Sequence, residues 1–253
     1  MSVEEAAKRI FGERAAFYTT STVHADPKVL AEIVRLAAPR PDWAALDIAT
    51  GTGHTALALA PHVGSVVGID LTPAMLAEAE RLRDERGVTN VAFREGDVHH
   101  MPFAAASFDL VTCRRAAHHF SDIARALREI GRVLRPGGVV IIDDRAVPED
   151  DFVDRCLNQL DWYHDESHVR EYRPSEWRRM LPECGLVVET LETSTRHRPL
   201  TAFTDGVCAG NVAKIHAMLD ALTEDQRTAL HLTEVGGEPF LDHWYVLIAA
   251  RKH

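Results

Sequence analysis

Ala44-Ala-Leu-Asp-Ile-Ala-Thr-Gly-Thr-Gly53-His-Thr-Ala56 is the segment that decides the fold, because an apolar strand runs into a glycine turn that opens a helix. Gly51 and Gly53 let the backbone take positive φ angles and approach a ligand closely, which a side chain would obstruct. In a parallel α/β sheet such a turn lies at the carboxyl edge, where ligands bind. The segment predicts a doubly wound α/β fold with a nucleotide-type ligand.

The glycine spacing alone does not choose the cofactor. Gly51-x-Gly53-x-x-Ala56 also satisfies the dinucleotide fingerprint, and Asp70 follows at a distance that suits a ribose hydroxyl in NAD enzymes. Asp47 decides the choice, because a carboxylate at the end of the first strand repels a pyrophosphate and attracts a cationic α-amino group. S-adenosylmethionine (SAM) carries such a group and NAD does not, so SAM is the predicted ligand.

Short apolar runs alternate with amphipathic segments on either side of this turn. The alternation is typical of βα units around a parallel sheet. A helix that starts at Ser121 is predicted to end at Arg135-Pro136-Gly137-Gly138, where proline and paired glycines break it. The predicted strands of this core are 44–48, 66–69, 91–93, 108–113 and 139–142.

Further helices are predicted before and after the core. Residues 3–37 have a helical pattern, and a second helix begins there with Asp26 as N-cap and Pro27 as its first residue. Residues 147–182, charged and aromatic, are predicted as an inserted helical segment. The remainder is predicted as a strand at 186–191, a helical stretch at 212–230, a loop at 234–238 and a last strand at 244–250.

Composition limits the classes of partner. The 253 residues are 46% hydrophobic and 26% charged, as in ordinary globular proteins. A formal net charge of −10 repels phosphate backbones and anionic headgroups, so neither nucleic acid nor a membrane is an expected partner. Widely spaced cysteines and an N-terminus without an apolar signal segment favour a cytoplasmic location. The oligomeric state stays open, with a homodimer as one alternative.

Five blocks of sequence follow one another in order between Phe11 and Asp143. They are 46–53, 66–70, Gly96-Asp97-Val98, 107–113 and 129–138. Together they resemble the motifs of class I SAM-dependent methyltransferases, especially the branch of the ubiquinone and menaquinone C-methyltransferases. That family often has glycine where this chain has Ala49, so the turn here must tolerate a methyl group.

The resemblance implies a Rossmann-like sheet of seven strands, the last one antiparallel, with helices on both faces and a helical cap. The single domain, 1–253, would comprise an N-terminal helical lid at 1–37, a SAM-binding core at 38–146, and cap insertions at 147–182 and 200–233. Phe11-Gly-x-x-Ala-x-x-Tyr18 is similar to the lid of that branch. The residues expected to bind SAM are Tyr18, Asp47, Ala49, Gly51, Gly53, Asp70, Leu71, Asp97, Val98 and Arg114.

His118 and His119 follow the fourth predicted strand, at the edge where ligands collect. Methyl transfer to a hydroxyl or a carbon acid benefits from a base, and either histidine is a candidate for it, with helix capping as the alternative. Adjacent histidines are expected to point in different directions, so no metal site is predicted. His99 and His100 are expected at the surface.

The acceptor side is less defined by the sequence. Arg115 is a candidate for orienting an acidic acceptor, or for pairing with local carboxylates. In related enzymes the insertion after the fifth strand helps to form the acceptor pocket, which makes Trp162, Tyr163, His164 and Tyr172 candidates for substrate binding. Trp177 is expected instead to lie in the core, where it would anchor a helix that Ser175 caps.

The predicted function is transfer of a methyl group from SAM to an O, N or C nucleophile of a small-molecule acceptor. The same motifs would serve a SAM-binding protein that does not methylate, and the glycine spacing still permits an NAD-dependent oxidoreductase. A macromolecular acceptor is disfavoured by the acidic composition and by the absence of an Asn-Pro-Pro-Tyr-type motif after the fourth strand.

Overall fold

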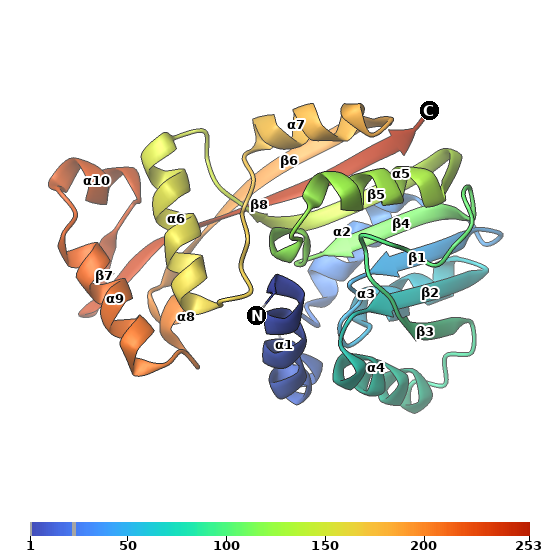
Figure 1. The fold of residues 1–253 in the computed structure, drawn as a ribbon, viewed down its shortest axis with the longest axis horizontal. Coiled ribbons are helices and arrows are strands. Elements are labelled where there is room, and N and C mark those ends of the chain that lie inside the picture. The colour runs from blue at the N-terminus through green and yellow to red at the C-terminus, as the bar shows by residue number, and fades with distance from the viewer. Residues whose placement is uncertain (1, 22–23) are drawn as a thin grey trace.

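Eight strands form one mixed sheet at the centre of the computed structural model, which describes residues 2–21 and 24–253 (Figure 1). The strand order is β3-β2-β1-β4-β5-β8-β6, and β7 pairs with β8 outside this path. Strands β1 to β5 are parallel, whereas β8 is antiparallel to both β5 and β6. The strands are β1 (Ala44–Ile48), β2 (Ser65–Asp70), β3 (Val91–Glu95), β4 (Phe108–Arg114), β5 (Leu134–Ala146), β6 (Leu186–Pro199), β7 (Thr233–Val235) and β8 (Glu238–Lys252).

The predicted Rossmann-like fold with an antiparallel last strand is confirmed. The count of seven strands is exceeded by one, because β7 folds back on β8 as a hairpin over Gly236 and Gly237. Both glycines have positive φ, 63° and 85°, which is the backbone that such a tight turn requires. The predicted loop at 234–238 therefore lies entirely in this hairpin, where only Gly236 and Gly237 form the turn and the other three residues belong to β7 and β8.

Helices cover both faces of the sheet. On one face, Ile33, Leu57 and Ala79 from α2, α3 and α4 pack with the strands, and on the other face Leu127 and Trp177 come from α5 and α7. The helices are α1 (Val3–Thr20), α2 (Pro27–Ala37), α3 (His54–Leu59), η1 (Ala60–His62), α4 (Pro73–Glu85), η2 (Ala117–His119), α5 (Ile123–Val133), α6 (Asp151–His164), α7 (Pro174–Glu183), α8 (Thr201–Thr204), α9 (Ala209–Asp220) and α10 (Glu224–Ala229). None of the described helices contains an apolar stretch of the length that a bilayer span requires.

A cap stands at one end of the sheet. Figure 1 shows α6, α8, α9 and α10 together with β7 at the end away from β3, and α1 in blue between this cap and α4. The cap has its own apolar core, in which Leu157, Phe203 and Ile215 pack around Leu241 of β8. The two long strands β6 and β8 therefore belong both to the central sheet and to the cap.

Several predicted boundaries of helices and strands agree with the structure, and others differ from it. Asp26 caps α2 and Pro27 begins it, as predicted. Helix α5 ends at Val133, and β5 begins at the next residue rather than after Gly137 and Gly138. Helix α7 begins at Pro174 and not after Ser175, whose hydroxyl instead donates to Glu149. The stretch at 212–230 is divided between α9 and α10, and the strands at 186–191 and 244–250 are the inner parts of β6 and β8.

Candidate active site

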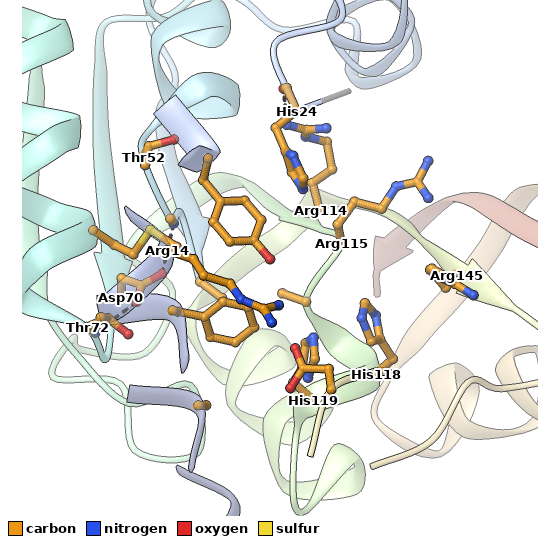
Figure 2. A pocket seen from close by; sticks show the side chains of 18 of the residues that line it. Arg14, His24, Thr52, Asp70, Thr72, Arg114, Arg115, His118, His119 and Arg145 are labelled. Carbon is orange, nitrogen blue, oxygen red and sulfur yellow. Dashed lines mark hydrogen bonds between the residues drawn. The ribbon is translucent and has the colours of Figure 1, made fainter. Parts of the chain in front are cut away.

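One cavity of about 690 Å³ lies at the carboxyl ends of the parallel strands, between the sheet, α1 and the cap. Figure 2 shows Asp70 and Thr72 on one side of it and His118 and Arg145 on the other. Ligand sites of enzymes commonly have volumes of about 300 to 1,000 Å³. The cavity is thus large enough for a cofactor and a small second reactant together.

Asp47 at the end of β1 is a buried carboxylate in the wall of this cavity. Its two oxygens accept hydrogen bonds from the hydroxyls of Thr112 and Thr50, both at 2.6 Å. Only 1% of the residue is exposed, and this burial raises its pKa to about 6 despite the two hydrogen bonds. A cation bound beside it would favour the ionised form.

The turn after β1 has the positive φ angles that the sequence predicts. Ala49, Gly51 and Gly53 have φ of 48°, 55° and 81°. A Cβ added to Gly51, which lines the cavity, would meet no atom of residues 2–21 and 24–253 within 4 Å, whereas one added to Gly53 would lie 2.7 Å from Phe93 Cζ. Gly51 therefore leaves space for a ligand, and Gly53 allows close packing behind the cavity wall.

Asp70 at the end of β2 ties this turn to the next one. Its carboxylate accepts the backbone N–H of Gly51 at 2.8 Å and that of Thr72 at 2.9 Å. Burial raises its pKa above the ordinary value of aspartate. Asp70 and the neighbouring Leu71 both line the cavity, next to the glycine turn.

The block after β3 contributes differently from the expectation. Gly96 and Val98 line the cavity, but Asp97 is not among the described residues that do so. The Asp97 carboxylate binds the backbone N–H and the ring Nδ1 of His99, at 2.8 and 2.7 Å. The expectation that His99 lies at the surface is wrong, because this pairing buries it to 7% exposure in the cavity wall. His100 is exposed, as expected.

Helix α1 brings Tyr18 to the cavity. The Tyr18 ring packs edge-on against Phe11 and His24, with centroids 5.8 and 4.6 Å away, and burial raises its pKa to about 12. Arg114, at the end of β4, reaches the same region and donates to Thr55 Oγ1 at 3.0 Å and to the His24 carbonyl at 2.5 Å. Tyr18 and Arg114 therefore enclose the end of the cavity near Asp47.

His118 and Asp144 form a buried dyad across the cavity. The carboxylate of Asp144, 1% exposed at the end of β5, contacts His118 Nδ1 at 2.6 Å and accepts the His118 backbone N–H at 3.0 Å. Burial alone would raise the pKa of Asp144, but the charge and hydrogen bond of His118 bring it below the ordinary value. With Nδ1 engaged, Nε2 is the ring nitrogen left to act on a ligand.

His119 lies next to His118 but in a different environment. Its ring is 4.1 Å from that of His118, so the expectation that the two point in different directions is wrong. Its Nδ1 lies 3.1 Å from the Ser167 carbonyl oxygen, and its ring packs on Phe11. Burial, with the adjacent His118, lowers the pKa of His119 to about 3, which makes it a weak base. Of the two candidates, the geometry favours His118.

Only part of the predicted acceptor side reaches the cavity. Arg115 and His164 line it, whereas Trp162, Tyr163 and Tyr172 are not among the described residues that do. Trp162 is 43% exposed and Tyr172 is buried against Trp177, at a centroid distance of 5.4 Å. Trp177 is fully buried, as expected.

Other residues of the cavity wall are not predicted by the sequence. Arg145 follows Asp144 in β5 and is paired with Asp161 of α6 at 2.7 Å, and the charge of Arg145 overcomes burial to lower the pKa of Asp161 to about 2. Within residues 2–21 and 24–253, no three His, Cys, Asp or Glu side chains are arranged to hold a metal ion. The unpredicted wall residues include Arg14, His24, His54, His99, Arg145, Asp161, Asp165, His168, Arg198 and Tyr245.

Comparison with known proteins agrees with this geometry. Residues 46–142 match the model of a methyltransferase domain. The uncharacterized methyltransferase YcgJ of Bacillus subtilis is 40% identical over 182 residues, which are 72% of each protein. A demethylmenaquinone methyltransferase of Chlorobaculum parvum is 40% identical over 104 residues, 41% of each protein.

Solved structures extend the similarity to the cap. The crystal structure of B. subtilis YcgJ has a TM-score of 0.83 at 34% identity and covers 88% of this chain and 97% of that one. A putative methyltransferase from Bacillus halodurans has a TM-score of 0.84 at 32% identity, with coverages of 88% and 98%. Since the likeness spans both the sheet and most of the remaining chain, the protein belongs to the class I methyltransferase family.

Proposed function

We propose that the protein transfers a methyl group from SAM to an oxygen, nitrogen or carbon nucleophile of a small molecule. The observation that carries the proposal is that one cavity joins Asp47 and Asp70 at one side to the His118–Asp144 dyad at the other. When bound, SAM supplies an activated methyl group on a sulfonium. The chain must then hold the acceptor in line with it and exclude water.

The residues around Asp47 fit SAM. The buried Asp47 carboxylate suits the α-amino group, and Arg114 at the same end suits the α-carboxylate. Asp70 keeps lone pairs for the ribose hydroxyls beside its two backbone partners. Gly51 leaves room for the ligand, while Ala49, Leu71 and Val98 provide apolar wall.

His118 is the residue we assign as general base, with Asp144 as its positioning residue. The Asp144 carboxylate fixes the ring and stabilises the imidazolium that forms when Nε2 takes the acceptor proton. His119, neutral and packed on Phe11, shapes the wall between the base and α1. Acceptors that need no base, such as amines, require only the positioning.

Helix α1 and the cap are proposed to close the cavity. Residues 1–37 would act as the lid over a SAM-binding core at 38–146, and the segments 147–182 and 200–233 would form the acceptor side. Arg14 of α1 donates to the carbonyl of Gly206, after α8, at 3.3 Å. This exposed contact links lid and cap above the cavity and is of the kind that opens at small cost in free energy. All four cysteines are free thiols, which supports a reducing compartment such as the cytoplasm.

A labelling experiment tests the proposal. The purified protein is incubated with methyl-tritiated SAM and a size-fractionated cell extract, and Asp70→Ala is the control for the SAM site. Label in the small-molecule fraction with the wild type but not with the control would support the proposal. Label only in macromolecules would contradict the acceptor class. If SAM binds in calorimetry but no fraction gains label, a SAM-binding role without methylation becomes the better account.

A further inference from the structure

A group of arginines shares one face of the sheet beside His118. Tyr245 of β8 is paired with Arg145 of β5. Two other β8 residues, His243 and Leu241, are paired with Arg196 and Arg198 of β6. Paired residues of antiparallel strands project to the same face, and so does every second residue along a strand. Arg145, Arg196, Arg198 and Tyr245 therefore lie on a common face, and all of them except the exposed Arg196 line the cavity.

The ring of Tyr245 is the centre of this arrangement. The guanidinium carbon of Arg115 lies 4.1 Å from its centroid, and that of Arg196 lies 5.4 Å from it. Tyr245, Arg115 and Arg198 all line the cavity. In Figure 2, Arg115 and Arg145 are on the same side of the pocket as His118 and opposite Asp70.

The arginines differ in their counter-ions. Arg145 is paired with Asp161 at 2.7 Å, so its charge is compensated within the protein. Among the described residues, Arg115 has one carboxylate partner, Asp143, which lies 3.2 Å from its Nε. Among the described residues, neither Arg196 nor Arg198 has a carboxylate within ion-pair distance. Met1, Thr22 and Val23, which the structure does not describe, carry no carboxylate side chain.

The carboxylates nearby do not take the place of a counter-ion for Arg198. Asp165 accepts the N–H and the hydroxyl of Ser167, at 2.9 and 2.7 Å, and Asp205 is exposed at the rim. Of Arg115, Arg145 and Arg198, which all line the cavity, Arg198 is therefore the one without a carboxylate partner among the described residues, and arginine binds carboxylate or phosphate through paired hydrogen bonds. In a chain of net charge −10, such a local cluster is also what an anion needs in order to enter.

We propose that the acceptor carries an anionic group, carboxylate or phosphate, which Arg198 and Arg115 hold within the cavity while the nucleophile faces His118. The identification of the bound anion as the methyl acceptor rests on the proposed function. The existence of the anion site does not. The anchored group is distinct from the methylated atom, so the product keeps its charge. Recognition of one anionic group at a fixed distance from the base then selects among small molecules.

Direct anion binding tests the site without turnover. Benzoate and inorganic phosphate are titrated by calorimetry at low ionic strength into the full-length protein, with and without S-adenosylhomocysteine. We expect at least one probe to bind, and Arg198→Gln to weaken its binding by about tenfold, or about 1.4 kcal/mol, because the variant loses a charged hydrogen-bond donor to the anion. Which probe binds more tightly distinguishes carboxylate from phosphate. Arg179→Gln, an exposed position on α7, is the matched control and should bind like the wild type.

Failure of this inference is distinguishable from failure of the proposed function. If neither probe binds, or if Arg198→Gln binds as well as the wild type, the anion site is overturned even when S-adenosylhomocysteine binds. If S-adenosylhomocysteine does not bind but the anion does and requires Arg198, the site stands and the proposed function falls. In the labelling experiment, tritiated product retained on an anion-exchange resin supports the inference, and a product that flows through contradicts it.

Discussion

The carboxylate of Asp144 binds both the backbone N–H and the ring Nδ1 of His118, at 3.0 and 2.6 Å. Two contacts from one buried side chain fix the position and the tautomer of the imidazole together. The neighbouring His119 has no such carboxylate partner in the part of the chain that the structure describes, and contacts the Ser167 carbonyl instead. The two adjacent histidines should therefore respond differently to substitution.

Substitution of His118 should impair turnover far more than substitution of His119. For an acceptor that must lose a proton, His118→Gln is expected to lower kcat by about 100-fold or more, the usual contribution of a general base. His119→Gln should stay within several-fold of the wild type, since burial already lowers its pKa to about 3. SAM affinity, measured by calorimetry, should be unchanged in both. Equal losses in the two variants would contradict the assignment.

Asp144→Asn should reduce turnover while His118 remains. The imidazolium formed during proton transfer would lose its stabilising carboxylate, so kcat should fall by about tenfold or more. For the same reason the acid limb of the kcat–pH profile should move to lower pH. A purely structural defect would lower kcat at every pH without moving this limb, and the profile distinguishes the two.

Asp47 should make the stability of the ligand-free protein depend on pH. Its folded pKa, about 6, lies above that of the unfolded chain, so the folded state binds the proton more tightly and loses stability as pH rises through this window. Relative to Asp47→Asn, the wild type should lose roughly 2 kcal/mol of unfolding free energy between pH 4 and pH 7.5. Urea unfolding of both proteins at the two pH values measures this, and parallel pH dependences would refute it.

Ala49→Gly should stabilise the protein slightly. Ala49 has φ of 48°, a left-handed backbone that costs a non-glycine residue about 1 to 2 kcal/mol, while glycine adds up to about 1 kcal/mol of unfolded-state entropy. A net gain of up to about 1 kcal/mol is expected, with SAM affinity retained. Ala56→Gly, inside α3, is the control of opposite sign and should lose about 1 kcal/mol. Urea midpoints of the two variants test the contrast.

Gly68→Ala should destabilise the sheet through Phe93. A Cβ at Gly68 would lie 2.6 Å from Phe93 Cδ1, across the β2–β3 pairing, so a loss of about 1 to 3 kcal/mol is expected. In a Phe93→Leu background the same change should cost less, because the smaller side chain can move aside. The four proteins form a double-mutant cycle by urea unfolding, and strictly additive losses would show that the contact is not the cause.

The parallel core could be predicted because its signals are local. Apolar runs, glycine turns and helix caps such as Asp26 depend on a few neighbouring residues, and the structure agrees with them closely. The outer half of β6 escaped prediction because Thr193 to Arg198 are polar and largely exposed, so no alternation of apolar residues identifies a strand there. Pairing along β8 holds this segment in the sheet, and such pairing is not visible in the sequence of β6 alone.

The cofactor side of the site was predicted better than the acceptor side. Asp47, Gly51 and Asp70 lie within one turn of strands that the sequence marks clearly, and all three line the cavity. Arg198 and Tyr245 line the same cavity only because the register of β6 and β8 puts them on one face, although they are more than forty residues apart in the chain. His99 is buried because Asp97 binds its ring, a side-chain contact that composition does not reveal.

The continuity of β6 and β8 from the sheet into the cap has a consequence for redesign. The acceptor-side arginines and the core strands are carried on the same two uninterrupted segments, Leu186–Pro199 and Glu238–Lys252. An exchange of the cap with that of a relative must therefore keep the alternation of faces in both strands, since a shift of one residue would turn Arg198 and Tyr245 away from the cavity. New acceptor specificities are more accessible through point changes on this face than through transplanted helices.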